Sequence, residues 1–114
     1  MKYKHSDSLK KYREFTCVYQ HGTSYANRIL VLYVLKKDKE KNSLGISVSK
    51  KVGNSVVRHH LTRLVRESYR KHEDEFDRGL DLVVICRPGA KESDFFEIER
   101  ALLSLGKRAA ILEN

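Results

Sequence analysis

A chain of 114 residues with 40% hydrophobic residues and a single proline can bury one modest core but not two, so we expect one domain over residues 1–114. Its formal net charge is +8, with 23 Lys and Arg against 15 Asp and Glu, which favours a nucleic-acid partner if the charge is clustered. Cys17 and Cys86 lie far apart without CxxC spacing, no apolar run reaches ~18 residues, and the N-terminus lacks a secretory pattern. These features argue against a disulfide framework, a zinc site and a membrane protein, and they predict a cytoplasmic location.

The first predicted element is a helix near the N-terminus. Apolar residues recur at three- and four-residue intervals between Leu9 and Tyr19, as one face of a helix requires. Asp7 or Ser8 can cap its start, and Gly22 ends it.

A strand is predicted next. In residues 26–35, both the odd-numbered and the even-numbered positions carry aliphatic or β-branched side chains. This pattern is typical of a central strand covered on both faces. A further strand can form if the segment 23–35 bends. Residues 36–43 are charged and polar, and we interpret them as a solvated hairpin connection.

The following strand has two unequal faces. Its apolar side chains alternate with small ones, which are Gly45, Ser47 and Ser49. Something can therefore approach the small-residue face closely. A tightly packed helix and a groove for an extended ligand both remain open.

The segment 50–72 carries most of the charge, because its seven Lys or Arg residues face one acid, Glu67, for a net +6. Asn54 or Ser55 can cap a helix that runs to about Lys71. Aliphatic residues fall along one side of this helix. The opposite side carries His59, Thr62, Arg63, Arg66 and Arg70. This cationic face predicts phosphate binding that weakens with salt, although a merely solvated face is the plainer alternative.

The remainder of the chain predicts one strand and one helix. Residues 73–78 are acidic, residues 80–86 have the apolar density of a buried strand, and the Pro-Gly pair at 88–89 turns the chain. Ser93 can cap a last helix, whose apolar residues recur over residues 95–112 and pack into the core. The resulting order, helix, strand, strand, helix, strand, helix, predicts an α+β sandwich.

Patterns for catalysis and metal binding are weak. The KKVGN segment lacks a complete phosphate-loop motif, and the side chains of His59 and His60 point in different directions on a helix. Four carboxylates in a polar segment could be imagined to hold Mg²⁺, but their setting favours a solvated turn. They are Asp74, Glu75, Asp77 and Asp81.

Three aromatic residues near the start of the sheet, Phe15, Tyr19 and Tyr33, could stack on unpaired bases. Each such contact contributes roughly 1–3 kcal/mol when it forms. Core packing is the alternative, although the hydroxyls of Tyr19 and Tyr33 favour a cleft wall.

Together these segments resemble the protein subunit of bacterial ribonuclease P. The resemblance rests on FTCVYQHGTSYANRILVLYVL, LGISVSKKVGNSVVRHHLTRLVRE and DLVVICRPGA, and it spans about residues 9–105. It implies an α+β two-layer sandwich, with a four-stranded mixed sheet and three helices, of the kind found in domain 2 of ribosomal protein S5. It also implies a left-handed βαβ crossover, whereas the general rule predicts a right-handed one.

The resemblance implies a subunit of an endoribonuclease rather than a catalyst in its own right. The family protein binds the catalytic ribonuclease P RNA, one protein per RNA, and assists removal of the 5′ leader from precursor tRNA. The chemistry belongs to the RNA with Mg²⁺, so we expect no catalytic residues, no intrinsic metal and no membrane partner in this chain.

Family roles carry over to two sets of residues. The expected RNA-binding set is Lys50, Lys51, Asn54, Arg58, His59, His60, Thr62, Arg63, Arg66 and Arg70. The expected leader cleft is lined by Phe15, Tyr19, Tyr33, Ser47 and Ser49.

The chain departs from the family's Arg-Asn-Arg signature, which here reads Arg58-His59-His60, and it has Thr62 where Lys is usual. Two fixed positive charges are therefore missing. We hypothesise that RNA affinity rises as pH falls through about 6.5, because histidine gains charge there. A His59→Gln, His60→Gln double variant with an unchanged pH profile would contradict this.

Two other classes of protein remain as alternatives. One is a ribosomal-type or chaperone-like RNA-binding scaffold with no role in cleavage. The other is a free-standing nuclease, which the lack of a carboxylate or histidine cluster in the sequence disfavours.

Overall fold

The computed structural model describes residues 3–112 as a five-stranded mixed sheet with three helices. The strand order across the sheet is β1-β4-β5-β3-β2. The strands are β1 (Ser6–Ser8), β2 (Thr23–Ala26), β3 (Leu30–Lys36), β4 (Asn42–Val48) and β5 (Leu80–Cys86). The helices are α1 (Tyr12–His21), α2 (Ser55–His72) and α3 (Phe95–Arg108), and short 3₁₀ turns lie at Glu73–Glu75 and Pro88–Ala90.

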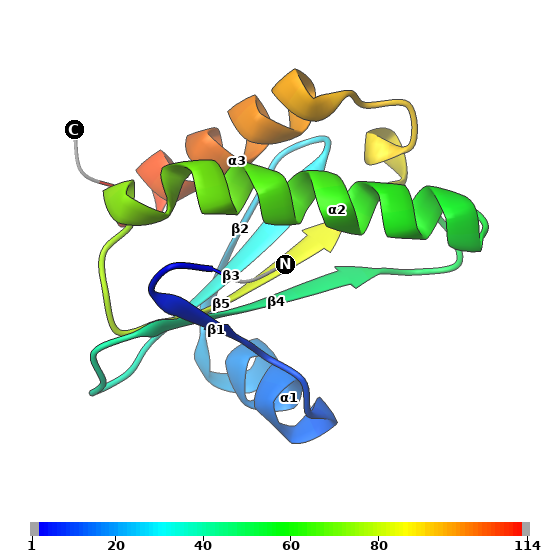
Figure 1. Ribbon diagram of the computed structural model, residues 1–114. Helices are drawn as coiled ribbons and strands as arrows, with labels where there is room; N and C mark the ends of the chain where they lie inside the picture. The colour runs from blue at the N-terminus through cyan, green and yellow to red at the C-terminus, as the bar shows by residue number, and fades with distance from the viewer. Residues whose placement is uncertain (1–2, 113–114) are drawn as a thin grey trace.

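Helices cover both faces of the sheet, with α2 and α3 on one side and α1 on the other (Figure 1). The main core lies between the sheet and the α2–α3 layer, and it includes Leu32, Val84, Leu61 and Leu102. A smaller core under α1 is formed by Leu9, Val18 and Val83. The expected α+β class is confirmed, but the sheet has five strands rather than four. The expected two layers are the sheet and the pair α2 and α3, and α1 adds a further helix on the opposite face of the sheet.

The centre of the sheet is β5, which pairs with β4 in parallel and with β3 in antiparallel fashion. The segment 26–35, expected to be one central strand, bends at residues 27–29 into β2 and β3, and β3 becomes an interior neighbour of β5. The bend forms because the Asn27 side-chain oxygen accepts hydrogen bonds from the backbone N–H of Ile29 (3.1 Å) and Leu30 (2.8 Å). The further strand that this segment allowed is β2.

The connection at residues 37–41 is not the hairpin predicted from its composition. β5 lies between β3 and β4, so the connection crosses the end of β5 to reach the next strand. The Lys37 N–H donates to the Gly79 carbonyl (2.7 Å), which ties this crossing to the start of β5.

The N-terminal segment begins with a strand instead of a helix. Asp7 and Ser8, expected as helix caps, pair in parallel with Ser43 and Leu44 of β4. α1 starts at Tyr12, where the Glu14 carboxylate accepts hydrogen bonds from the N–H groups of Lys10 and Lys11 (3.3 and 3.0 Å). The three-residue strand was missed because its stability comes from β4 and not from its own pattern.

The two longer helices largely match the sequence-based expectation. Asn54 caps α2, since its side-chain oxygen accepts the Val57 N–H at 3.0 Å. The cap of α3 is Asp94, one residue after the predicted Ser93, and it accepts the Glu97 N–H at 2.9 Å. α3 ends at Arg108, so the last apolar residue of the predicted stripe, Leu112, lies beyond the helix.

Asp81 does not belong to a solvated turn. It lies buried in β5 and forms an ion pair with Lys39, whose ammonium also donates to the Ser43 hydroxyl (2.9 Å). Asp74, Glu75 and Asp77 are exposed, as predicted. Among residues 3–112, no helix is both long enough and apolar enough to cross a membrane.

Candidate nucleic-acid interface

α2 is a rigid platform for cationic side chains. Its apolar side packs Leu61, Leu64, Val65 and Tyr69 against the sheet and α3. The helix has 18 residues, about 27 Å of length at the usual rise. The expected RNA-binding side chains on its other sides are exposed or half-buried. They are Arg58, His59, His60, Thr62, Arg63, Arg66 and Arg70.

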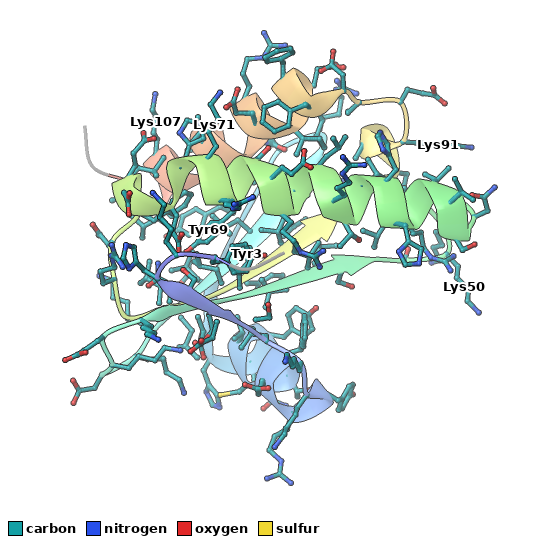
Figure 2. The ribbon with its side chains drawn as sticks, in the orientation of Figure 1. Tyr3, Lys50, Tyr69, Lys71, Lys91 and Lys107 are labelled. Atoms are coloured by element: carbon teal, nitrogen blue, oxygen red, sulfur yellow. The ribbon has the colours of Figure 1, made fainter. Side chains whose placement is uncertain are left out.

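The turn before α2 extends this cationic surface past the end of the helix. Lys50 and Lys51 are exposed there, and Figure 2 shows Lys50 at the N-terminal end of α2. The Val52 N–H donates to the Ser49 carbonyl (3.1 Å), which fixes the turn. Gly53 allows the turn to pack closely against the first turn of α2, because a Cβ at this position would lie 2.8 Å from Val57 Cγ1. Phosphate oxygens would meet both fixed charge and helix N–H groups at this end.

Two arginines and one threonine on the expected RNA-binding side of α2 already have partners within the protein. Arg63 pairs with Glu67 at 3.0 Å, but the arginine side chain is 71% exposed, so this pair is easily exchanged for a phosphate. Arg58 donates to the Gly53 carbonyl (3.2 Å), a neutral acceptor that leaves its charge uncompensated. The Thr62 hydroxyl donates to the Arg58 carbonyl (2.9 Å), so its proton is already used within the helix.

The second predicted set of residues meets on the opposite face of the sheet. Tyr19 of α1 and Tyr33 of β3 pack edge to face with ring centroids 5.0 Å apart, and Phe15 lies 6.4 Å from Tyr19. Burial raises the pKa of Tyr19, and the nearby Ser47 hydroxyl partly opposes that rise. Tyr19 remains 38% exposed. The three aromatics and Ser47 therefore form one continuous surface, which we call the aromatic face.

The tightly packed helix explains the small-residue strand at Gly45, while the groove for an extended ligand stays a prediction for Ser47 and Ser49. A Cβ on Gly45 would lie 2.6 Å from the Phe15 ring, so Gly45 is where α1 packs tightly. Ser47 is half-buried beside Tyr19, and Ser49 is exposed. The strand thus leaves α1 toward its C-terminal end and becomes open surface.

The two surfaces meet around the outer edge of β4. β1 pairs only with residues Asn42, Ser43 and Leu44, and within the described chain no strand pairs with the outer edge of the rest of β4. A hollow of about 250 Å³ lies here between β4 and α2. Its lining residues are Ile46, Val48, Arg58, His59 and Thr62.

Sequence reasoning missed how the N-terminal segment braces α2. The buried Glu73 carboxylate accepts hydrogen bonds from Lys4 N–H (2.9 Å), His5 N–H (2.8 Å) and the Ser6 hydroxyl (2.6 Å). Burial alone would raise the pKa of Glu73, but these hydrogen bonds outweigh it and the pKa is lowered. A glutamate following a basic helix gives no sequence signal of this role.

The same segment places an aromatic ring against the cationic helix. Tyr3 packs edge to face on Tyr69, with centroids 5.3 Å apart (Figure 2). Burial raises the pKa of the Tyr3 hydroxyl, and a hydrogen bond from Arg66 partly opposes the rise. Tyr3 therefore lies close to Arg66 on α2.

Metal ligation has no obvious place in this arrangement. Between residues 3 and 112, no three His, Cys, Asp or Glu side chains come together in a way that would hold an ion. His59 and His60 are exposed on α2, with no acidic partner among the ion pairs of the described residues. The arrangement offers cations and aromatic rings, the groups that bind phosphates and unpaired bases.

Comparisons with known proteins agree in pointing to one family. The family model described as Ribonuclease P matches residues 3–110. The ribonuclease P protein component of Lachnoclostridium phytofermentans is 50% identical over 109 residues, covering 96% of this chain and 94% of that protein. The corresponding protein of Alkaliphilus metalliredigens is 46% identical over 107 residues, covering 94% of this chain and 96% of that protein.

Solved structures give the same result. The RNase P protein of Staphylococcus aureus matches with a TM-score of 0.86 and 34% identity, over 93% of this chain and 97% of that chain. The RNase P protein of Thermotoga maritima matches with a TM-score of 0.82 and 32% identity, over 90% of this chain and 96% of that chain.

Proposed function

This chain belongs to the ribonuclease P protein family, and from that premise we propose that it holds the catalytic RNA on α2 and the 5′ leader of precursor tRNA on the aromatic face. As a ribonuclease P protein component it is a subunit of an endoribonuclease that processes tRNA, and it associates with ribonuclease P RNA. The division of labour between the two surfaces is our inference from their chemistry.

The observation that carries the first half is the uncompensated charge along α2. Four arginines lie on one helix, and only Arg63 has a carboxylate partner among the described residues. Arginine presents a planar set of donors that matches phosphate oxygens. With Lys50, Lys51 and the helix N-terminus, this surface supports contact with a folded RNA backbone along the length of α2.

The second half rests on the aromatic face. Tyr19 and Tyr33 present ring surface and hydroxyls, while Ser47 and Ser49 add small polar groups nearby. Stacking tolerates any base, and hydroxyls can bind the backbone without reading sequence. Such a surface suits the varied leaders of precursor tRNAs.

In this proposal the chain binds and orients, and the RNA supplies the reaction chemistry with Mg²⁺. The described side chains do not fit a metal site, as noted above, so no Mg²⁺ is assigned to this protein. We assign no step of phosphodiester hydrolysis to its residues.

The remaining features of the assembly follow from the same premise. We propose that residues 1–114 form a single ribonuclease P protein domain, and the family match over residues 3–110 supports this. We also propose that one protein binds each RNA and that the assembly acts in the cytoplasm. We also infer that the crossover from β4 through α2 to β5 is left-handed. Its support is the arrangement in Figure 1, with β4 in front of β5 and α2 above them.

The test of function is reconstitution. The protein is added to ribonuclease P RNA at low Mg²⁺, and cleavage of precursor tRNA is measured against protein alone and RNA alone. We expect efficient cleavage only in the mixture. RNA binding with no gain in cleavage would instead favour a ribosomal-type scaffold, and cleavage by protein alone would favour a free-standing nuclease.

The leader assignment has its own test. Tyr19→Ala should weaken binding of leader-bearing precursor tRNA to the holoenzyme by about 5- to 150-fold, the range of one lost stacking contact. Binding of mature tRNA should not change. Gln20→Ala, an exposed neighbour on α1, is the matched control. Equal losses with both tRNAs would contradict a leader contact.

A further inference from the structure

A second group of arginines surrounds the turn between β2 and β3. It consists of Arg28 in the turn, Arg87 after β5, and Arg100 and Arg108 on α3, and all four are exposed. We call it the turn cluster. Four of the chain's ten arginines are gathered here, as many as lie on α2.

The turn that carries this cluster is firmly held. The Asn27 side chain closes the turn and donates to the Ala101 carbonyl of α3 (3.1 Å). The segment after β5 packs closely on it, since a Cβ on Gly89 would lie 2.6 Å from the Arg28 carbonyl oxygen. The cluster therefore stands on a rigid junction of α3, β2 and the end of β5.

Two of the guanidinium groups are oriented by the backbone of the turn. Arg87 Nη1 donates to the Asn27 carbonyl (2.8 Å), and Arg108 Nη1 donates to the Ala26 carbonyl (2.7 Å). Carbonyl oxygens are neutral, so both side chains keep their full charge and most of their five N–H donors. Fixing two long side chains costs conformational entropy that a merely solubilising residue does not need.

The four arginines also lack a direct carboxylate partner. Within residues 3–112, none of the four arginines forms an ion pair. Arg28 and Arg100 line an open hollow of about 290 Å³ whose one carboxylate is Glu97. Glu97 is directed to the helix cap, where it accepts the Asp94 N–H at 3.2 Å, and its single negative charge leaves the two arginines of the hollow with a net charge of +1. The turn cluster therefore combines two backbone-oriented guanidinium groups, Arg87 and Arg108, with two arginines that line a hollow, Arg28 and Arg100. Such donors suit the charge of a phosphate backbone.

We propose that the turn cluster is a second RNA-contact surface, which binds the phosphodiester backbone of a segment distinct from the one held by α2. α2 packs over β4, whereas α3 packs over β3 and β2, toward the other edge of the sheet. A single RNA helix lying along α2 does not need charges at the β2 edge. This inference rests on the proposed function, because it takes the polyanion to be the RNA of that assembly.

The experiment uses Arg28→Gln, Arg100→Gln, because these two side chains make no backbone hydrogen bond within the described chain that their loss would break. Lys37→Gln, Lys41→Gln is the matched control, since it removes the same charge from exposed positions in the connection between β3 and β4. Arg63→Gln, Arg70→Gln on α2 is the reference for the first surface. Equal thermal melting temperatures verify that all three variants fold.

Two binding assays identify which RNA is held. Affinity for ribonuclease P RNA and affinity of the assembled holoenzyme for precursor tRNA are each measured over a salt series. We expect the turn-cluster variant to lose about 10-fold in one of them, with the log K against log salt slope reduced by about two, one for each lost phosphate contact. The assay in which affinity falls shows whether the turn cluster contacts ribonuclease P RNA or precursor tRNA.

The outcomes separate this inference from the proposed function. A turn-cluster variant that behaves like the lysine control in both assays, while the α2 variant weakens binding, overturns the second surface alone. If neither the α2 variant nor the turn-cluster variant differs from the control, the proposed function fails and this inference fails with it.

Discussion

Glu73 is the residue on which the N-terminal segment depends. Its carboxylate lies at the junction of α2 and β1, where it accepts hydrogen bonds from two backbone N–H groups and a hydroxyl. Only 2% of the residue is exposed, so removing its negative charge leaves donors without an equivalent acceptor. The segment that carries Tyr3 is therefore held against the end of α2 by Glu73.

Glu73→Gln should lower the free energy of unfolding by about 1–3 kcal/mol at pH 7. Since the folded-state pKa of Glu73 is lowered, its contribution is complete above about pH 4.5 and is lost as pH falls through the folded pKa. The difference from wild type should therefore shrink in acid. Urea unfolding at pH 7 and pH 3 measures this, with Glu40→Gln in the exposed connection as control.

Gly45 sets the distance between α1 and the sheet. Gly45→Ala places a methyl group 2.6 Å from the present position of the Phe15 ring and 3.2 Å from Leu9 Cβ, so the ring must move. We expect a loss of about 1–3 kcal/mol in urea unfolding. Adding Phe15→Leu should recover part of this loss. Strictly additive effects of the two changes would show that the contact is not the cause.

At the scale of elements, α2 and α3 are joined by a cluster of charged groups near the C-terminal end of α2. His72 Nε2 contacts the Glu99 carboxylate at 2.7 Å, His72 Nδ1 contacts Glu75, and Lys71 pairs with Glu99 at 2.9 Å. Burial alone would lower the pKa of His72, but hydrogen bonds to Glu99 and Glu75 outweigh it and the pKa is raised. Protonated His72 therefore holds the two helices together.

His72→Gln should destabilise the protein more at pH 6 than at pH 8.5. A raised folded-state pKa gives stabilisation that is present below about pH 6.5 and disappears as pH rises through the folded value. Chemical unfolding at both pH values tests this, with exposed His60→Gln on the same helix as control. A pH-independent difference would contradict the charge-based explanation.

The long helices were predictable because their signals are local. Asn54 before an amphipathic run is sufficient to start α2, and the apolar stripe of α3 identifies its buried side. β1 and the order of the sheet were not predictable in this way, because they depend on partners distant in sequence. Asp81 is an example: it falls inside the predicted strand at residues 80–86, but its charge suggested a solvated turn. Its burial becomes understandable only with Lys39, 42 residues away, which pairs with it.

The candidate site was predictable as two separate sets of residues, but not as an arrangement. Helical periodicity brought Arg63 and Arg66 to one face, and alternation brought Ser47 and Ser49 to another. Their placement on opposite sides of the sheet follows from where α1 and α2 pack, which no local pattern encodes. The contact between Tyr3 and Arg66 also required the three-dimensional fold.

At the scale of the whole molecule, the net charge of +8 governs association with RNA. If about six phosphates are neutralised, log K for ribonuclease P RNA should fall against log salt with a slope of about −5. Binding measured in a potassium acetate series at constant Mg²⁺ tests this. A slope near zero would mean that the cationic surfaces are not where the RNA binds.

The open margin of β4 beyond Leu44 has a consequence for substrate choice. In the proposed arrangement the catalytic RNA lies on the α2 side of the sheet and the 5′ leader on the α1 side. The leader must therefore pass around this edge of β4, and the thickness of the sheet sets a minimum length for it. Extensions too short to round the margin would gain nothing from the rings of Tyr19 and Tyr33. The protein would thus select precursor transcripts by the length of their unpaired 5′ ends and not by the nucleotide sequence of those ends.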